Sequence, residues 1–240
     1  MQTAIATSES VLELLCRGFG RNHIIEELCL MPGEYNAAVS EINKQYPTPE
    51  QKISAAMHMG LDVSPAYGEW ADDLSYVELE ILALTSKGIS NRQIAKLREV
   101  KAEWCNWAFS RIYSKLFWGD HDTNYNSINL AVALFLDADR RGLIDWNKTL
   151  DKEGFRKTNN GLATILIWEL LVRERKGMAH ISDSEIVELS GKMKQSQELV
   201  KGALDRFAAV GFISKTESGY QLVRGNTYSQ NGNGGRNGAL

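Results

Sequence analysis

Cysteine, proline and long apolar runs are all scarce in this chain of 240 residues, and each scarcity excludes a class of protein. The three cysteines are widely spaced and form no C-x-x-C motif, which excludes a disulfide framework and a zinc ribbon. No apolar run approaches the roughly 20 residues that cross a bilayer, and the most apolar stretch, residues 162–172, contains Glu169. The N-terminal residues lack the basic and apolar regions of a secretory signal peptide. We therefore expect a cytoplasmic protein with no membrane association.

Only four prolines interrupt a chain that is rich in Leu, Ala, Glu and Lys, which favours a mainly helical protein. The hydrophobic fraction of 43% is close to the globular norm, and the length suits one to three small domains. The chain has 27 Lys and Arg against 30 Asp and Glu, a net charge of −3. This balance excludes a uniformly basic coat for nucleic acid and leaves room for a localised basic face.

The chain contains an internal repeat with an offset of 70 residues. Residues 11–30 align with residues 81–100, so that apolar positions fall on apolar positions and Gly18 falls on Gly88. Glycine is the residue type that closes a helix in the left-handed conformation. Each block is therefore expected to contain a helix that ends at its glycine and is followed by a short polar turn.

Three more helices are expected in each block after this turn. The second helix is capped by Asn22 in the first block, and by Ser90 or Asn91 in the second. Two helices joined by a tight turn, with the second presented outward, form the helix-turn-helix arrangement. The third and fourth helices are predicted over residues 33–46 and 48–61 in the first block, and over 101–116 and 126–143 in the second.

The last third of the chain predicts a winged helix. Three helices are followed by two short strand-like runs about a Ser218-Gly219 turn, which indicates a β-hairpin. These elements are predicted over residues 159–177, 181–191, 193–212 and 213–225.

The predicted fold class is mainly α, with two tandem four-helix domains of the helix-turn-helix type, a winged helix and a small β-hairpin. The Gly- and Asn-rich end of the chain is expected to be disordered. The expected domains are residues 1–65, residues 72–146 and residues 156–225, followed by a tail over residues 226–240.

The second block resembles the LuxR/GerE helix-turn-helix family, and this resemblance implies a DNA-binding domain of four helices. The first block resembles the family mainly through its likeness to the second. The residues that carry the resemblance are the opening Leu74 and Glu78, the helix-closing Gly88, the turn Ser90-Asn91-Arg92 before Ile94-Ala95, and then Ser110, Arg111, Ile112, Lys115 and Leu116.

The second block departs from that family where its recognition helix begins. The family's Thr-Val-Lys run, which meets phosphates and base edges, is replaced by Trp104-Cys105-Asn106-Trp107. Of these side chains, only that of Asn106 can form a bidentate base contact. The first block is acidic, because residues 1–70 contain four basic and nine acidic side chains. Phosphate repels an acidic recognition helix, so we expect the first block to keep the fold without contacting DNA.

The C-terminal domain resembles winged-helix regulators of the MarR or GntR sort. The shared sequence pattern consists of Ser196, Val200, Ala203, Leu204, Arg206, Phe207, Gly211, Phe212 and Ile213. Such domains place the third helix in the major groove and the hairpin against the DNA backbone. The resemblance places Lys192, Lys194, Gln195, Ser196 and Lys201 at the start of that helix, and Lys215 and Arg224 on the wing.

Two sets of candidate residues follow from these patterns. Lysines and arginines are expected to anchor phosphates, while Asn106, Gln195 and Ser196 are expected to touch base edges. The DNA-binding set is Arg92, Lys96, Lys101, Asn106, Arg111, Lys115, Lys192, Lys194, Gln195, Ser196, Lys201, Lys215 and Arg224. The set expected at an interface with a second copy or another subunit is Tyr35, Val39, Trp104 and Trp107.

The same residues allow plainer interpretations. On the first of these, the cations form a solvated face without a ligand. On the second, the winged helix is a protein-interaction module, a role that this fold also has. Trp104 and Trp107 lie three residues apart on one face of a helix, and packing in a core or on a partner helix is the main expectation for them. An exposed patch for self-association and base stacking, as in single-strand binders, are the alternatives.

The leading function hypothesis is a DNA-binding transcriptional regulator that acts as a homodimer or higher homo-oligomer. Its expected partners are double-stranded DNA and, further, RNA polymerase. A plasmid- or phage-type protein that binds an origin or partition site is an alternative of the same class. A protein-interaction adaptor built from helix-turn-helix folds is an alternative of a different class. No enzyme activity, cofactor or metal is expected, because the sequence contains no Gly-rich phosphate loop, nucleophile motif or metal-ligand spacing.

Overall fold

The computed structural model describes residues 2–117, 125–146, 159–178 and 180–222, and for residues 2–7, 159 and 160 it describes the backbone alone. Within these residues the protein is mainly helical, with one small antiparallel sheet. The expected mainly α class is therefore confirmed. No helix in the described part of the chain has the length and apolar character needed to span a membrane. Arg224 and the expected tail lie outside the described residues.

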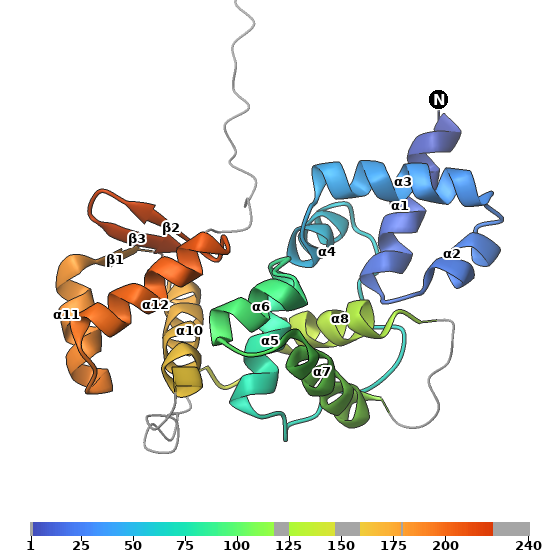
Figure 1. Cartoon of the computed structure of the whole chain (residues 1–240). Helices are drawn as coiled ribbons and strands as arrows, with labels where there is room; N and C mark the ends of the chain where they lie inside the picture. Colours follow the sequence, from blue (N-terminus) through green and yellow to red (C-terminus); the bar gives the residue numbers. More distant parts are fainter. Residues whose placement is uncertain (1, 118–124, 147–158, 179, 223–240) are drawn as a thin grey trace, which may run out of the picture.

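The helices form three groups, which Figure 1 shows with the second group between the other two. The first unit contains α1 (Gln2–Cys16), α2 (Arg21–Glu27), α3 (Pro32–Gln45) and α4 (Pro49–His58). The second unit contains α5 (Tyr76–Ser86), α6 (Asn91–Arg98), α7 (Ala102–Leu116) and α8 (Ser127–Arg140). The third unit contains α10 (Asn159–Arg175), α11 (Asp183–Met193), α12 (Gln197–Ala209) and the strands β1 (His180–Ser182), β2 (Ile213–Thr216) and β3 (Gly219–Leu222).

The 70-residue repeat seen in the sequence is also a repeat of backbone structure. The glycines Gly18 and Gly88 have positive φ angles of 93° and 79°, and each closes the first helix of its unit. Helices α6 and α7 begin 70 residues after α2 and α3. The capping expectation is confirmed for Ser90, whose side chain accepts a hydrogen bond from the backbone N–H of Gln93. It is wrong for Asn22, because α2 begins one residue earlier and its N-cap is Gly20.

The turn between the second and third helices of the repeat occurs three times with the same backbone hydrogen bonds. In the second unit Glu99 adopts the left-handed conformation, and the N–H of Val100 donates to the carbonyl of Ala95. This is the 6→1 bond of a Schellman-type helix end. The corresponding left-handed residues are Cys29 in the first unit and Lys194 in the third, and the corresponding bonds join Leu30 to Ile25 and Gln195 to Ser190.

This third copy of the turn corrects the predicted start of the last helix. The sequence prediction began that helix at residue 193, whereas α12 begins at Gln197 with Ser196 as its N-cap. Lys192 lies in the last turn of α11, and Lys194 is the left-handed residue that closes α11. Gln195 lies in the turn. These side chains therefore flank the turn and do not form the first helical turn of α12.

The sheet of the third unit has the order β1-β3-β2, with all pairs antiparallel. Strands β2 and β3 are the hairpin expected from the sequence, and Gly219 begins β3. Strand β1 was missed, because three residues directly before a helix leave no alternating pattern to read. It joins the hairpin to the start of α11 through the pairing of Ile181 with Tyr220.

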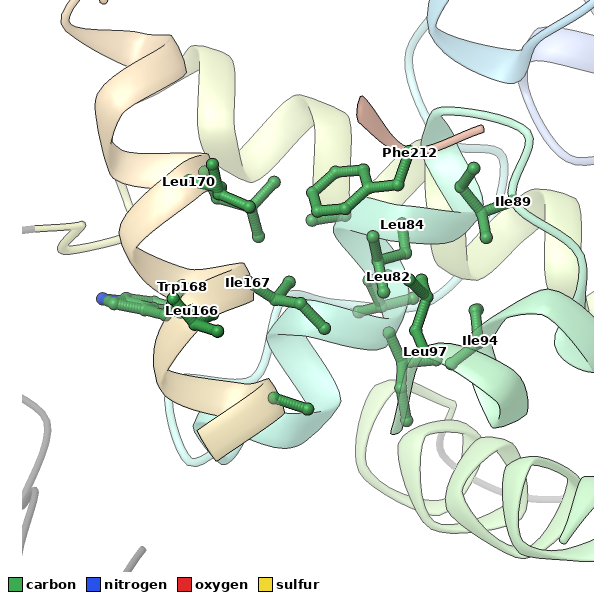
Figure 2. Packing of buried hydrophobic residues seen from close by; sticks show 14 of the residues in the cluster. Leu82, Leu84, Ile89, Ile94, Leu97, Leu166, Ile167, Trp168, Leu170 and Phe212 are labelled. Atoms are coloured by element: carbon green, nitrogen blue, oxygen red, sulfur yellow. The ribbon is translucent and has the colours of Figure 1, made fainter. Parts of the chain in front are cut away.

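One hydrophobic core runs through the second and third units, and the first unit has a core of its own. Helix α10 packs on α5 and α6, and α12 packs on α6. Figure 2 shows Ile167 of α10 facing Leu82 of α5, with Phe212 lying beside this contact. The third unit therefore packs against α5 and α6 and helps to position α6 and the turn that follows it.

Candidate nucleic-acid interface

The helices α3, α7 and α12 occupy the same place after the repeated turn, so they can be compared position by position. Each buries the same face against its own unit and leaves the opposite face outward. The buried positions that correspond in α3, α7 and α12 are Tyr35, Cys105 and Val200, then Ala38, Ala108 and Ala203, then Ile42, Ile112 and Phe207.

The second unit surrounds its turn with cations that have no partner. Arg92 and Lys96 lie one helical turn apart on α6, and Lys101 is the N-cap residue of α7. All three side chains are exposed, and none forms an ion pair or a hydrogen bond with another side chain of the described residues. Free ammonium and guanidinium groups at the start of a recognition helix are suited to phosphate contacts.

The other two units lack this arrangement at the corresponding positions. The residues that correspond to Arg92 and Lys96 are Asn22 and Glu26 in the first unit, and Val187 and Gly191 in the third. The backbone of the turn is the same in the three units, but the charge of the surface around it differs, and so does the ligand that the surface attracts.

The outward face of α7 presents an amide and a large aromatic ring. The side chains of Asn106 and Trp107 are both exposed, and 56% of the Trp107 surface is accessible. The guanidinium of Arg111 lies 5.0 Å from the centroid of the Trp107 ring, and its Nε lies 3.5 Å from Oε1 of Glu78. The side chain of Arg111 therefore lies along α7, in contact with both Trp107 and Glu78.

Lys115, at the end of α7, is part of the fold of the second unit. Its Nζ donates to Oε2 of Glu78 at 3.0 Å and to the carbonyl of Asp73 at 2.8 Å. Burial raises the pKa of the Glu78 carboxyl, but the backbone N–H of Ser75 and the ammonium of Lys115 outweigh it and hold the pKa below its usual range. Lys115 therefore ties the end of α7 to the start of α5.

The N-terminus of α7 differs from that of α3 in its local charge. In α3 the carboxylate of Glu34 accepts a hydrogen bond from the backbone N–H of Met31 at 2.8 Å, which places a negative charge at the helix start. In α7 the corresponding residue is Trp104, Lys101 forms no side-chain cap, and the acidic residue of the first turn is Glu103. Helix N-termini attract phosphate, and at the start of α7 the cation of Lys101 accompanies this carboxylate, whereas α3 has no cation at the corresponding position, Met31.

A buried ion pair joins the end of α6 to α5, next to the turn of the second unit. Nη1 of Arg98 donates to Oε1 of Glu80 at 2.6 Å, and the exposed fractions of the two side chains are 4% and 0%. Burial raises the pKa of Glu80, while Arg98 and the hydroxyl of Thr164 on α10 lower it. The guanidinium of Arg98 also lies 4.8 Å from the centroid of Trp104. These contacts join α5, α6, α7 and α10 at one point.

Three lysines of the third unit are engaged with carboxylates, whereas Lys176 and Lys194 are exposed and form no ion pair within the described residues. Lys192 pairs with Glu188 at 2.6 Å, and Lys201 pairs with Asp183 at 3.1 Å.

On the wing, Lys215 pairs with Asp205 at 3.0 Å. The Tyr220 hydroxyl and the Lys215 ammonium hold the pKa of Asp205 below its usual range. The side chain of Ser196 accepts from the backbone N–H of Leu199 as the cap of α12. Lys215 and Ser196 are therefore both engaged in contacts within the third unit.

Comparisons with protein-family models, with curated proteins and with solved structures found no match for this chain. The function must therefore be argued from the surface itself. Among the described residues, no group of three or more His, Cys, Asp or Glu side chains is placed to hold a metal ion.

The residues expected at an interface fall into different environments. Tyr35 is only 8% exposed and belongs to the core of the first unit, because it occupies the inward position of α3 that Cys105 occupies in α7. Val39 is half-buried against the same core. Trp104 is half-buried against the core that the second and third units share, so packing explains it. Of these four residues, only Trp107 has a large exposed apolar surface.

Arg92 and Lys96 lie on α6, Lys101 is the N-cap residue of α7 and Asn106 lies in its first half, whereas Lys115 lies in an intramolecular ion pair. The buried pair of Glu80 and Arg98 was missed. One signal for it exists in the sequence, since Glu80 stands inside the otherwise apolar run of residues 79–84. A carboxylate at such a position needs a buried partner.

Proposed function

We propose that this protein binds double-stranded DNA through α6 and α7 and acts as a transcriptional regulator. The observation that carries the proposal is that Arg92, Lys96 and Lys101, on α6 and at the start of α7, are exposed and have no ion-pair partner within the described residues. The resemblance of this segment to LuxR/GerE domains agrees with it. In this proposal α7 is the recognition helix.

The third unit is proposed to be a winged helix that supports the reading unit. Its order of β1, α11, α12 and a hairpin suits that fold. It also contacts α6 and the turn directly, because Nε2 of Gln93 donates to the carbonyl of Val210 at 2.9 Å and Arg206 lies 3.2 Å from Glu99. Because Lys192, Lys201 and Lys215 are paired with carboxylates, we propose that its main role is to hold α6 and α7 in position.

The first unit is proposed to contribute no phosphate contacts. Its turn has Glu26 where the second unit has Lys96, and Glu34 lies at the start of α3. Both carboxylates would face the phosphates if α3 approached a duplex as α7 is proposed to do, and like charges repel.

The test is a binding titration of the full chain with a labelled duplex of random sequence at several salt concentrations between about 50 and 200 mM. Each phosphate contact contributes about 0.9 to the slope of log K against log salt. We expect the triple variant Arg92→Gln/Lys96→Gln/Lys101→Gln to reduce the magnitude of that slope by about 2.7.

The matched control is Lys192→Gln/Lys194→Gln/Lys201→Gln, which removes the same charge from the third unit. It is expected to change the slope by less than one phosphate contact. Absence of duplex binding by the unmodified protein at low salt would refute the proposal. Equal losses in the two triple variants would refute the assignment to α6 and α7. Mapping of bound sites over a genome then separates a promoter regulator from an origin-binding protein.

A protein-interaction adaptor is the second candidate, and the exposed ring of Trp107 is the observation that favours it. Large apolar side chains on an outward face are typical of protein interfaces. Light scattering of the unmodified protein and of Trp107→Ala distinguishes the two functions. A fall in molecular mass in the variant, without duplex binding by either protein, would support the adaptor.

A further inference from the structure

The outward face of α7 contains side chains suited to an A·T base pair and lacks a free cation for guanine. In the major groove, adenine offers N7 and N6 to an Asn or Gln amide, and thymine offers a C5-methyl group to apolar surface. Guanine is read by Arg or Lys through O6 and N7. The identities of the exposed residues on α7 therefore predict which base pairs the helix prefers.

Asn106 and Trp107 are the pair that matches A·T. Both are exposed, and they are consecutive residues in the first half of α7, where a recognition helix meets base edges. The guanidinium of Arg111 lies over the Trp107 ring, and 56% of the surface of this residue remains accessible. The two residues thus offer an apolar surface for a thymine methyl group and an amide for an adenine edge.

The other side chains on this face do not provide a guanine contact. Arg111, its one cation in the middle of the helix, is held between the Trp107 ring and Glu78. The hydroxyl of Ser110 donates to the backbone carbonyl of Asn106 at 3.1 Å, so its proton is already used. Glu103 is an acceptor in the first turn, and its carboxylate suits a cytosine amino group at the edge of the site.

We propose that α7 reads A·T base pairs, with the Asn106 amide on adenine and the Trp107 ring on the thymine C5-methyl group. This assignment rests on the proposed binding of duplex DNA by α6 and α7. It adds the class of sequence that the surface recognises, and it gives the exposed tryptophan a defined ligand.

The experiment compares four duplex probes: alternating A·T, the same duplex with deoxyuridine in place of thymidine, alternating G·C, and that duplex with 5-methylcytosine. Deoxyuridine removes only the methyl group from each A·T pair, and 5-methylcytosine adds a methyl group at the same place in the groove. Removal of the methyl group is expected to weaken binding about fourfold for each methyl that Trp107 covers, which corresponds to about 0.8 kcal/mol.

Three variants connect the preference to its residues. Trp107→Ala is expected to bind the thymidine and deoxyuridine duplexes equally, while Trp107→Phe keeps part of the preference. Asn106→Ala is expected to reduce the preference for A·T over G·C about tenfold. Thermal melting of each variant checks the fold, and both side chains are exposed, so little change is expected there.

The outcomes separate this inference from the function on which it rests. Failure of the unmodified protein to bind any of the four duplexes refutes DNA binding itself. Binding that is equal for thymidine and deoxyuridine refutes the methyl contact and leaves DNA binding intact. A preference for thymidine that persists in Trp107→Ala also refutes it, because the preference would then come from another residue.

Discussion

Replacement of Arg98 by methionine tests the buried ion pair behind the turn of the second unit. Glu80 is fully buried and Arg98 nearly so, with 2.6 Å between Oε1 and Nη1. Arg98→Met keeps most of the side-chain volume but leaves the Glu80 carboxyl in the core without its cation. Loss of one partner from a buried pair costs about 3–5 kcal/mol, so we expect a decrease of that size in the free energy of unfolding at neutral pH.

The loss should depend on pH in a defined direction. Burial already raises the pKa of Glu80 in the folded protein, and Arg98 opposes that rise. Without Arg98 the folded pKa moves further above the value of about 4.3 that the unfolded chain has. A carboxyl with a raised folded pKa favours the folded state below the unfolded pKa, and this contribution is lost as the pH rises through the folded pKa. The deficit of Arg98→Met should therefore be smallest near pH 4 and grow toward neutral pH.

Urea unfolding followed by far-ultraviolet circular dichroism, between about pH 4 and pH 8, measures this deficit. The double variant Glu80→Gln/Arg98→Met removes the buried charge, so it should be more stable than Arg98→Met at neutral pH. Arg141→Met is the matched control, because Arg141 forms an exposed ion pair with Asp137, and such pairs contribute less than about 1 kcal/mol. A deficit in Arg98→Met no larger than in this control, or one that does not change with pH, would refute the reasoning.

Two further substitutions test local features. Gly18→Ala should lower the free energy of unfolding by about 2–4 kcal/mol in thermal or chemical denaturation, because its φ is +93° and an added Cβ would lie 2.7 Å from Cα of Leu130. The control Gly60→Ala, at φ +75° with open space around it, should lose only about 1 kcal/mol, and equal losses would contradict the steric explanation. Glu185→Gln should lower the free energy of unfolding by about 1 kcal/mol at neutral pH. Hydrogen bonds from the backbone N–H of Ser182 and from Arg173 lower the pKa of Glu185 to about 2, and the effect is modest because a third of the side chain is exposed. That loss should vanish as the pH falls from about 4.5 toward 2, which unfolding curves at acid pH can check.

Many helix boundaries could be predicted from the sequence because the signals that end a helix are local. Gly18 and Gly88 both close helices in the left-handed conformation, and Ser90 caps α6, as their residue types predict. The same logic failed at Lys194, which closes α11 without being glycine. A lysine in the left-handed conformation has no distinctive local pattern, so α12 was expected to begin too early.

The helical class, the 70-residue repeat and the residues that make up α6 and α7 could be predicted from the sequence, because each depends on patterns within short segments of the chain. Which cations are free depends instead on contacts between segments. Lys115 and Lys201 looked equivalent to Lys96 in the sequence, but each lies near a carboxylate from another helix, Glu78 and Asp183 respectively. Ion pairing depends on distances of a few ångströms between segments far apart along the chain, and no local pattern contains them.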